Sequence, residues 1–151
     1  MAKKESAGIL VYRYRQEQPE FFLVHMGGPF WKKKDKGAWT IPKGEIPPGE
    51  DGLTTACREF EEETGFVLEG PFQPLDTIKQ TGGKTVFAWS CQADLDPDAL
   101  TSNTFEIEWP PKSGQRQAFP EVDRAAWMTL EEAKGRIIKV QLGLLRQIPI
   151  P

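Results

Sequence analysis

Three glutamates in one short segment are spaced so that their side chains would project from the same face of a helix. Glu59, Glu62 and Glu63 stand at positions i, i+3 and i+4, and residues at that spacing are neighbours on a helix surface. Like charges so placed destabilise a helix, and the adjacent Arg58 cannot neutralise all three carboxylates. A hard cation such as Mg²⁺ binds carboxylate oxygens and is often shared with substrate phosphates. Two interpretations follow, a solvated acidic face and a metal site for phosphate chemistry.

The segment that carries these glutamates has the pattern of an amphipathic helix. Its apolar and small residues recur at helical spacing: Leu53, Ala56, Cys57, Phe60 and Thr64. Such a repeat predicts a helix over residues 52–64 whose apolar side faces a core. Asp51 suits the N-cap and Gly65 suits the position that follows the last turn. The carboxylates would then lie on a face other than the one that packs.

Alternating and apolar runs elsewhere predict strands that come in pairs. The expected strands are residues 8–14, 21–26, 73–79 and 84–93, the last two as a hairpin around 81–83, a weaker candidate at 105–109, and 125–129. A proline-rich, basic loop is expected at 110–120, and an amphipathic helical stretch begins at 130–134 and continues through Ile137, Leu144 and Leu145. The class is therefore α+β, or α/β with a mixed sheet, within a single domain over 1–151.

The charge distribution is more informative than the total. The 151 residues carry a net charge of −3, but residues 31–43 carry +4 and residues 44–66 carry −6. The small total argues against a nucleic-acid polymer as the main partner. No apolar run is long enough to span a bilayer, no signal peptide is visible, and two cysteines make no disulfide framework. We therefore expect a cytoplasmic protein without a membrane partner; the oligomeric state stays open.

The acidic helix forms part of a longer motif that resembles the signature of the Nudix hydrolases. A glycine is followed after five residues by a glutamate, and after seven more by Arg-Glu, an apolar residue, and a closing Glu-Glu-x-Gly. The matching fixed positions are Gly44, Glu50, Arg58, Glu59, Glu62, Glu63 and Gly65, with Phe60 and Phe66 at the apolar positions. We call residues 44–66 the box. The flanking strand order and the terminal helix also look like this family.

The resemblance implies a fold, a cofactor and roles for the box residues. In such enzymes the box forms a loop–helix–loop on an α/β/α sandwich with a mixed sheet, and it holds Mg²⁺, for which Mn²⁺ can substitute. Carried over, Glu59, Glu62 and Glu63 are metal ligands, or one of them is the general base. Glu50 and Arg58 brace the loop against the helix. The carbonyl of Lys43 or Gly44 completes the metal shell.

One acid outside the box is a further candidate for the site. Glu121 precedes the strand predicted at 125–129, and in several family members a glutamate so placed faces the metals as a ligand or base. The alternative is a solvent-exposed loop acid. Glu106 and Glu108 are weaker competitors for the same role.

Basic and aromatic side chains are candidates for substrate binding. Lys43 is nearest the box, Lys34 belongs to the lysine-rich segment, and Lys84 follows a Gly-Gly turn; each could attract phosphates or be ordinary surface. Trp39 could stack on a base, as could Phe30 and Trp31, although aromatic residues more commonly lie in the core.

The predicted reaction is metal-dependent hydrolysis of a nucleoside diphosphate linked to another group, by attack of water on phosphorus. The lysine-rich approach to the box favours a nucleoside triphosphate or a dinucleoside polyphosphate as the small-molecule partner. An ADP-ribose or nucleotide-sugar pyrophosphatase is an alternative. A nucleotide-binding module without catalysis is another, disfavoured because such modules usually lose box glutamates and none is lost here.

Overall fold

The apolar N-terminal strands pair as a hairpin at the centre of a mixed sheet. The structure is a computed structural model, and it describes residues 4–151. β1 (Glu5–Arg15) runs antiparallel to β2 (Gln18–Met26). Gln16 and Glu17 form the turn with φ of 51° and 65°. Two left-handed residues between paired strands match the right-handed twist of a hairpin.

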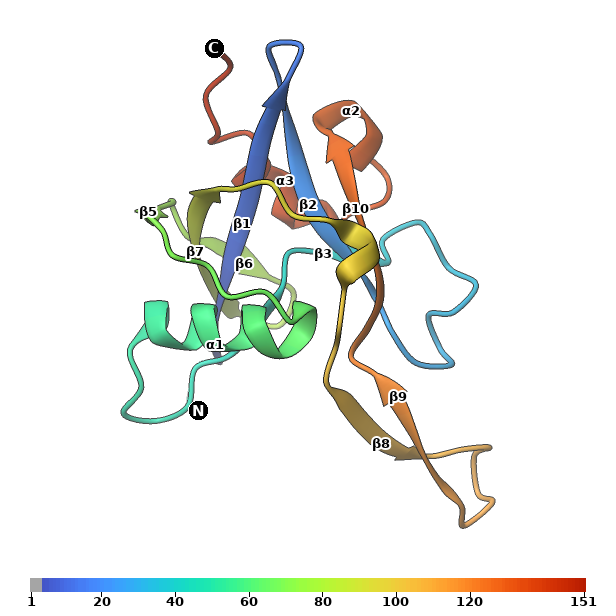
Figure 1. The fold of residues 1–151 in the computed structure, drawn as a ribbon. Coiled ribbons are helices and arrows are strands. Elements are labelled where there is room, and N and C mark those ends of the chain that lie inside the picture. Colours follow the sequence, from blue (N-terminus) through green and yellow to red (C-terminus); the bar gives the residue numbers. More distant parts are fainter. Residues whose placement is uncertain (1–3) are drawn as a thin grey trace.

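The remaining strands extend this hairpin on both sides (Figure 1). The order is β10 (Val122–Thr129), β2, β1, β7 (Lys84–Gln92) and β5 (Gln73–Pro74). β1 and β7 are parallel, and the other pairs are antiparallel, so the predicted mixed sheet is confirmed. Three short strands attach at the sides: β3 (Trp39–Thr40) on β2, β4 (Lys43–Glu45) on β1, and β6 (Ile78–Gln80) on β7.

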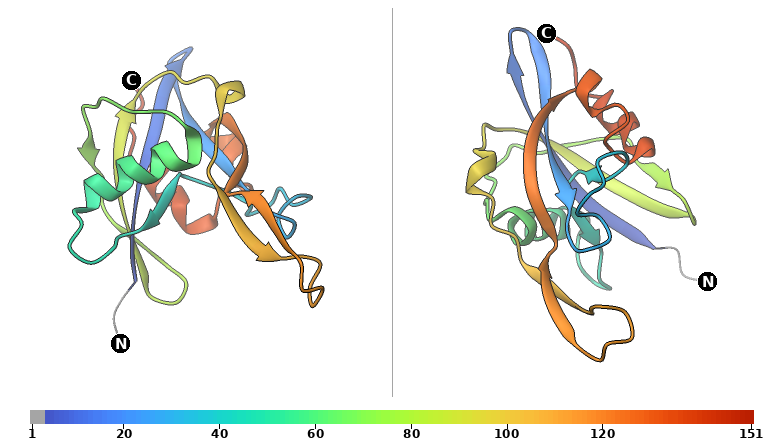
Figure 2. Two further views of the ribbon diagram at one scale, coloured as in Figure 1. Left: turned by 60° about the horizontal axis from the view of Figure 1, so that its bottom comes forward. Right: turned by 90° about the vertical axis from the view of Figure 1, so that its right-hand side faces the viewer.

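Helices cover both faces of the sheet, which confirms the α/β/α sandwich (Figure 2). α1 (Gly52–Thr64) lies on one face, over Ile9, Val11 and Phe22. On the other face, α2 (Leu130–Ala133) and α3 (Leu142–Leu145) pack in a cluster with alternate residues of the same strands, such as Leu10 and Leu23. The strands are therefore apolar on both sides, because neighbouring side chains point to opposite faces.

The C-terminal helical prediction is only partly correct. Instead of one amphipathic helix, the chain forms α2, a 3-10 turn η2 (Lys139–Gln141) and α3. Gly135 adopts a φ of 82° and ends the first piece. The predicted stripe is nevertheless buried at Ile137, Leu144 and Leu145. The short helical segments therefore supply the predicted apolar side chains to the core, although they do not form one continuous helix.

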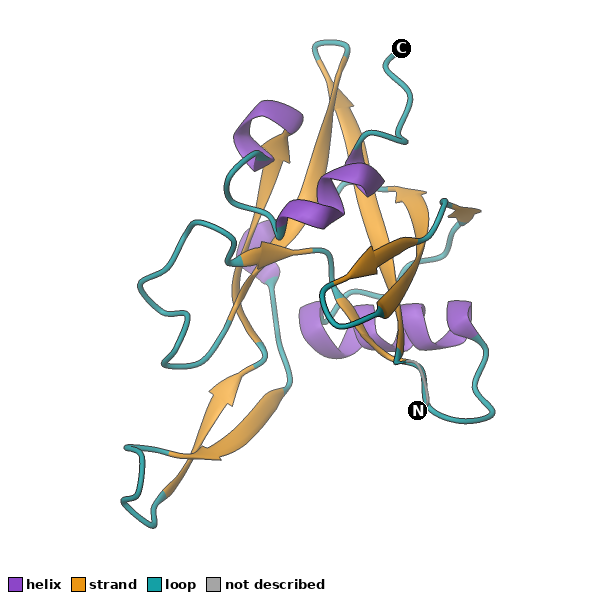
Figure 3. Ribbon diagram, turned by 180° about the vertical axis from the view of Figure 1, so that it is seen from behind, coloured by secondary structure: helices purple, strands orange, loops and turns teal. Residues whose placement is uncertain are grey.

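A two-stranded hairpin projects from the body of the sandwich (Figure 3). β8 (Thr104–Glu108) pairs with β9 (Arg116–Pro120), after a 3-10 turn η1 (Pro97–Ala99). The strand expected near 105–109 is confirmed, but the loop expected over 110–120 is wrong for its second half. None of the helices in residues 4–151 combines the length and apolar character needed to cross a membrane.

Candidate functional site

α1 begins and ends as the sequence predicts, and its ends fix which residues share a face. The Asp51 carboxylate accepts the Thr54 amide hydrogen at 3.2 Å and caps the first turn. Gly65 closes the last turn with a φ of 81°, and its N–H donates to the Glu61 carbonyl at 2.7 Å. Ala56 and Phe60 are fully buried against the sheet. The box glutamates consequently lie on other faces, towards β4 and solvent.

Arg58 ties the loop before α1 to the acidic face of the helix. Its Nη2 contacts the Glu50 carboxylate at 2.8 Å, and its Nη1 contacts Glu59 at 3.3 Å and Glu62 at 3.2 Å. Thr55 donates its hydroxyl hydrogen to the same Glu50 oxygen. Hydrogen bonds from Arg58 and Thr55 lower the pKa of Glu50, so this acid is held as a carboxylate. The loop–helix contact expected of Glu50 and Arg58 is therefore present.

Gly44 allows β4 to approach α1 closely. β4 pairs with the beginning of β1, with Gly44 opposite Ala7. A Cβ added to Gly44 would overlap the Glu59 carboxylate. Only a glycine leaves room for that carboxylate, so the first box glycine is required by packing and not by a turn. The backbone of β4 and the Glu59 carboxylate consequently lie in contact.

The carboxylates are crowded enough to disturb one another. Glu63 is only 9% exposed, and burial, followed by the charges of Glu59 and Glu121, raises its pKa to about 8. Burial and the Glu62 charge raise the pKa of Glu59, with a further contribution from Glu121. Desolvation and Glu62 raise the pKa of Glu121. A cation among these oxygens would relieve the repulsion.

Glu121 reaches this cluster from a distant part of the chain. It lies between β9 and β10, and its side chain is exposed. Its backbone is fixed on both sides, because its N–H donates to the Asn103 carbonyl and its carbonyl accepts from the Gly27 N–H, each at 2.9 Å. Glu106 and Glu108 lie further out on the hairpin, within β8.

The structure brings together two of the three lysines predicted to bind substrate. Lys43 is half-buried, and burial lowers its pKa, as does the charge of Lys84, while Glu63 opposes the shift. Lys43 and Lys84 therefore form a basic border beside the acidic cluster. Lys34 is exposed in the loop between β2 and β3. It lines a cavity between that loop and the projecting hairpin, not the acidic cluster.

The prediction that Trp39 stacks on a base is wrong. The indole is only 5% exposed and belongs to the core beneath α2 and α3. Its Nε1 donates to Asp35 at 2.7 Å, and its ring packs edge-on against His25 with centroids 5.2 Å apart. Trp39 has no free face for a ligand. Phe30, the neighbouring candidate, is 62% exposed.

The donor set fits a hard divalent cation, although the side chains do not enclose one. Carboxylate oxygens are the ligands that Mg²⁺ prefers, and the missing Cβ of Gly44 leaves the space that the Glu59 carboxylate occupies. Within residues 4–151, no three acidic, histidine or cysteine side chains form a ready-made cage. Arg58 Nη1 contacts Glu59 and Glu62 instead. The ligand roles of Glu59, Glu62, Glu63, Glu121 and Gly44 therefore stay predictions.

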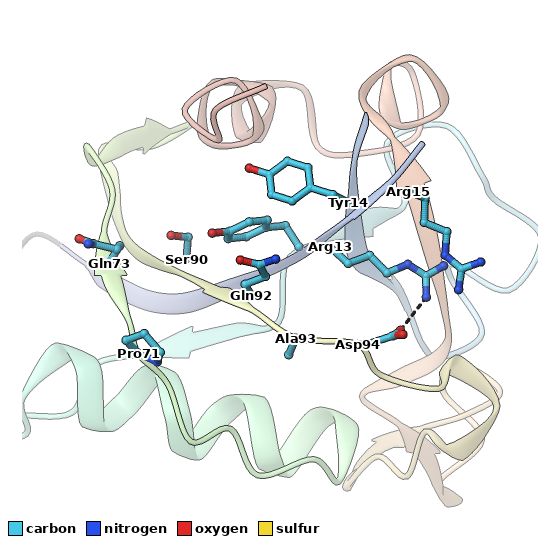
Figure 4. A pocket seen from close by; sticks show the side chains of 10 residues that line it. Arg13, Tyr14, Arg15, Pro71, Gln73, Ser90, Gln92, Ala93 and Asp94 are labelled. Atoms are coloured by element: carbon cyan, nitrogen blue, oxygen red, sulfur yellow. Dashed lines mark hydrogen bonds and ion pairs between the residues drawn. The ribbon is translucent and has the colours of Figure 1, made fainter. Parts of the chain in front are cut away.

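A large cavity lies beside the C-terminal half of β1, and the residues that line it include neither the box glutamates nor Glu121 (Figure 4). Its wall includes Tyr12, Tyr14 and Arg13, which follow Ala7, the partner of Gly44, by five residues or more. At 3.3 Å per residue, this places the cavity about 15–25 Å from Gly44. Arg13 is already paired with Glu20 and Asp94, at 2.9 and 2.7 Å. The Arg13 guanidinium is therefore already occupied by two acids.

Sequence patterns did not reveal a second cavity between the loop after β2 and the projecting hairpin. Trp109 and Phe119 line it from the hairpin, and Phe30 lines it from the loop. The alternation of Phe105, Ile107 and Trp109 was the available signal. It was weak because the prolines that follow indicate a loop.

The fold is an α/β/α sandwich, and the box places its acidic residues between α1 and β4. Together these two features define the class of protein. The NUDIX domain family model matches residues 2–147. The chain therefore belongs to the NUDIX family, and the resemblance seen in the box is confirmed.

The chain is similar in sequence and in structure to proteins whose activity is named. The bis(5'-nucleosyl)-tetraphosphatase (asymmetrical) of Rattus norvegicus is 46% identical over 102 residues, covering 63% of this chain and 58% of that protein. The chain thus spans little more than half the length of such relatives. A C. elegans Ap4A hydrolase binary complex superposes with a TM-score of 0.63 at 25% identity, covering 94% of this chain and 93% of the other.

A third similarity concerns the fold alone. The NUDIX domain of Shewanella oneidensis NrtR, solved as a complex with ADP ribose, has a TM-score of 0.65 at 17% identity, over 97% of this chain and 86% of that one.

Proposed function

We propose that this protein hydrolyses a phosphoric anhydride bond in a nucleoside diphosphate linked to another group, with a divalent cation. The preferred substrate class is a dinucleoside polyphosphate. One observation carries the proposal: beside Lys43 and Lys84, burial and the charges of neighbouring acids, Glu62 among them, raise the pKa values of Glu59 and Glu63 of α1 and of Glu121. The named activities of the rat and C. elegans proteins support the substrate class.

The residues divide the work according to their positions. In this proposal Glu59, Glu62 and Glu63 hold Mg²⁺, which would screen the phosphate oxygens and activate a water. Lys43 and Lys84 bind the phosphate chain from the adjoining strands. Glu121 is exposed at the edge of the cluster, where it can accept a proton from the attacking water; Glu59 is the competing base.

The backbone and the loop contribute positioning. Gly44 lets the β4 backbone approach Glu59, and Arg58 connects Glu50 to the acidic face of the helix. When water attacks phosphorus, the P–O bond of the anhydride breaks and the leaving phosphate departs with the bonding electrons. The proton of the water passes to the base. Since the box geometry does not read the base or sugar, specificity must come from outside the box.

A panel of substrates with resolved products tests the proposal. Purified protein with Mg²⁺ is incubated with diadenosine tetraphosphate, a nucleoside triphosphate and ADP-ribose, and products are separated by chromatography. We expect the tetraphosphate to be cleaved fastest, to a mononucleotide and a nucleoside polyphosphate, and EDTA to abolish cleavage. Equal turnover with and without EDTA would disprove metal dependence. Preference for ADP-ribose would favour the alternative pyrophosphatase.

A further inference from the structure

A lysine-rich cavity of about 560 Å³ lies between the loop that follows β2 and the projecting hairpin. Phe30 and Lys32–Lys34 line one wall, and Trp109 and Phe119 line the other. Its volume is within the range of small-molecule sites. The acidic cluster uses none of these residues, so the cavity needs its own explanation.

Two adjacent glycines press the loop against the root of the hairpin. The Gly27 N–H donates to the Glu121 carbonyl at 2.9 Å, and a Cβ on Gly27 would overlap the Pro120 carbonyl. A Cβ on Gly28, at a φ of 94°, would lie 2.9 Å from the Phe105 ring. Larger residues at either position would push the walls apart. The cavity is therefore preformed, which lowers the entropic cost of binding.

A buried histidine fixes the lysine-bearing loop to β10. His25 is 0% exposed; its Nδ1 lies 2.7 Å from Asp123 Oδ1, and its Nε2 lies 2.6 Å from the Lys34 carbonyl. The two contacts connect β2, which carries His25, to β10 and to the loop that carries the lysines. Asp123, an acid that lines the cavity, is held by this contact with His25.

The walls consequently present positive charge and aromatic surface together. Lys32, Lys33 and Lys34 are exposed, and the Lys34 ammonium lies 5.2 Å from the centroid of the Trp31 ring. Phe30 packs edge-on against Trp109, with centroids 5.3 Å apart and planes at 80°, yet it stays 62% exposed. A flat, anionic, aromatic ligand would bury this ring and pair with the lysines. A nucleotide has both properties.

The cavity adjoins the acidic cluster through the backbone. Pro120 lines the cavity, and Glu121, the next residue, faces the box glutamates. A ligand whose phosphates run along this route would touch both places. A mononucleotide held by the box alone would leave the cavity empty.

We propose that this cavity binds the second nucleotide of a dinucleoside polyphosphate whose anhydride lies at the box. The base packs against the aromatic wall formed by Phe30 and Trp109, and Lys32–Lys34 hold the phosphates nearest to it. This assignment deepens the proposed function and rests on it for the position of the cleaved bond. The binding of a nucleotide to the cavity does not depend on turnover.

Equilibrium binding in EDTA, where no hydrolysis is expected, tests the cavity by itself. Diadenosine tetraphosphate is titrated into wild-type protein, the double variant Lys32→Gln/Lys33→Gln, and Phe30→Ala. We expect Kd to rise about tenfold or more in both variants. Phe30→Ala removes an exposed ring and should leave folding intact. Lys112→Gln, on the same hairpin but outside the cavity lining, is the matched control and should keep Kd within about twofold.

Three results would overturn the assignment. Unchanged Kd in both variants means that the cavity does not bind the ligand. A loss in the lysine variant with none in Phe30→Ala means that it binds phosphate without a base. Tighter binding of a 5'-phosphorylated RNA oligonucleotide than of the dinucleotide, lost in the same variants, means that the ligand is RNA. If the expected binding changes appear but wild-type protein with Mg²⁺ cleaves no nucleotide, the proposed function fails and the cavity assignment stands.

Discussion

Individual acids of the box differ sharply in their surroundings. Glu63 is buried and carries a pKa raised to about 8, whereas Glu62 is 40% exposed at its side chain and paired with Arg58. Glu61 points away and is exposed. Neighbours along the helix therefore have separable roles, because successive side chains are turned by about 100°.

Removing a charge from α1 should affect turnover only at the carboxylates that belong to the proposed metal site. Glu62→Gln and Glu63→Gln keep side-chain volume while removing a charge that a cation would need. We expect each to lower kcat by about 10²–10⁴-fold, measured in steady-state assays with Mg²⁺. Partial recovery in excess Mn²⁺ would show that metal affinity was lost.

Glu61→Gln is the control for this prediction. Its carbonyl accepts the Gly65 N–H, and that bond does not involve the side chain. Activity should stay within about twofold of wild type. If Glu61→Gln is as damaging as Glu62→Gln, the assignment of faces is wrong.

The variant Glu121→Gln should show whether Glu121 is the general base or has no part in catalysis. If Glu121 accepts the proton of the attacking water, the variant loses turnover without rescue by Mn²⁺ and recovers partly at alkaline pH, where hydroxide replaces the activated water. The measurement is a profile of kcat against pH. Normal turnover at every pH would transfer the role to Glu59.

At the scale of elements, the site depends on the contact between β4 and α1. Gly44→Ala would place a methyl group on the Glu59 carboxylate. Because the carboxylate must move, we expect kcat to fall about 10²-fold or more while the circular dichroism spectrum is unchanged. The contact between β4 and α1 at this point depends on the packing of Gly44 against Glu59, and not on the loop that connects the two elements.

Gly143→Ala provides the matched control. Gly143 lies in α3, and its new Cβ would meet only Ile78 Cγ2 at 3.7 Å. Alanine is a better helix former than glycine, so the variant should be more stable by about 0.4–1 kcal/mol. Loss of activity in this variant would show that any added methyl group is harmful.

The loop before α1 should matter through metal affinity. Glu50→Gln weakens the contacts with Arg58 and Thr55, so Arg58 would be less well held beside Glu59 and Glu62. Removing such an outer partner commonly lowers metal affinity about 10–100-fold. Mn²⁺ titration followed by electron paramagnetic resonance measures it. An unchanged affinity would mean that the loop is positioned by other contacts.

At the scale of the whole molecule, the crowded acids make stability depend on pH. The pKa of Glu63 is raised from 4.5 to about 8 on folding, so the folded state holds a proton that the unfolded state has released. The free energy of unfolding of the metal-free protein should therefore fall as pH rises from about 4.5 to about 8. One such group contributes at most about 1.4 kcal/mol per pH unit.

Chemical denaturation in EDTA across this pH range measures the effect. Glu59 and Glu121 act in the same direction, and Glu50 acts in the opposite one. Glu63→Gln should flatten the dependence, and Mg²⁺ at pH 8 should stabilise the wild type by binding to the folded state. A wild-type profile that rises from pH 5 to pH 8 would contradict the raised pKa.

The sequence by itself determined the features that depend on local spacing. Asp51 and Gly65 set the bounds of α1, and its apolar period set the buried face, so the acidic face followed from helix geometry. The family could be predicted from the spacing of the box residues, and the α/β/α sandwich was implied by that resemblance. Apolar and alternating runs that come in pairs favoured a mixed sheet.

Tertiary structure alone decided which distant residues meet. Lys43 and Lys84 lie near each other because β4 and β7 both pair with the beginning of β1. Trp39 lies in the core because of packing that no local pattern shows. The prolines after Trp109 predicted a loop, so β9 was missed. β9 forms because it pairs with β8 on the other side of the turn. Glu121 reaches Glu59 and Glu63 only because backbone hydrogen bonds to Asn103 and Gly27 anchor it between two sheets. Contacts of this kind are set by packing between elements, and spacing along one chain does not encode them.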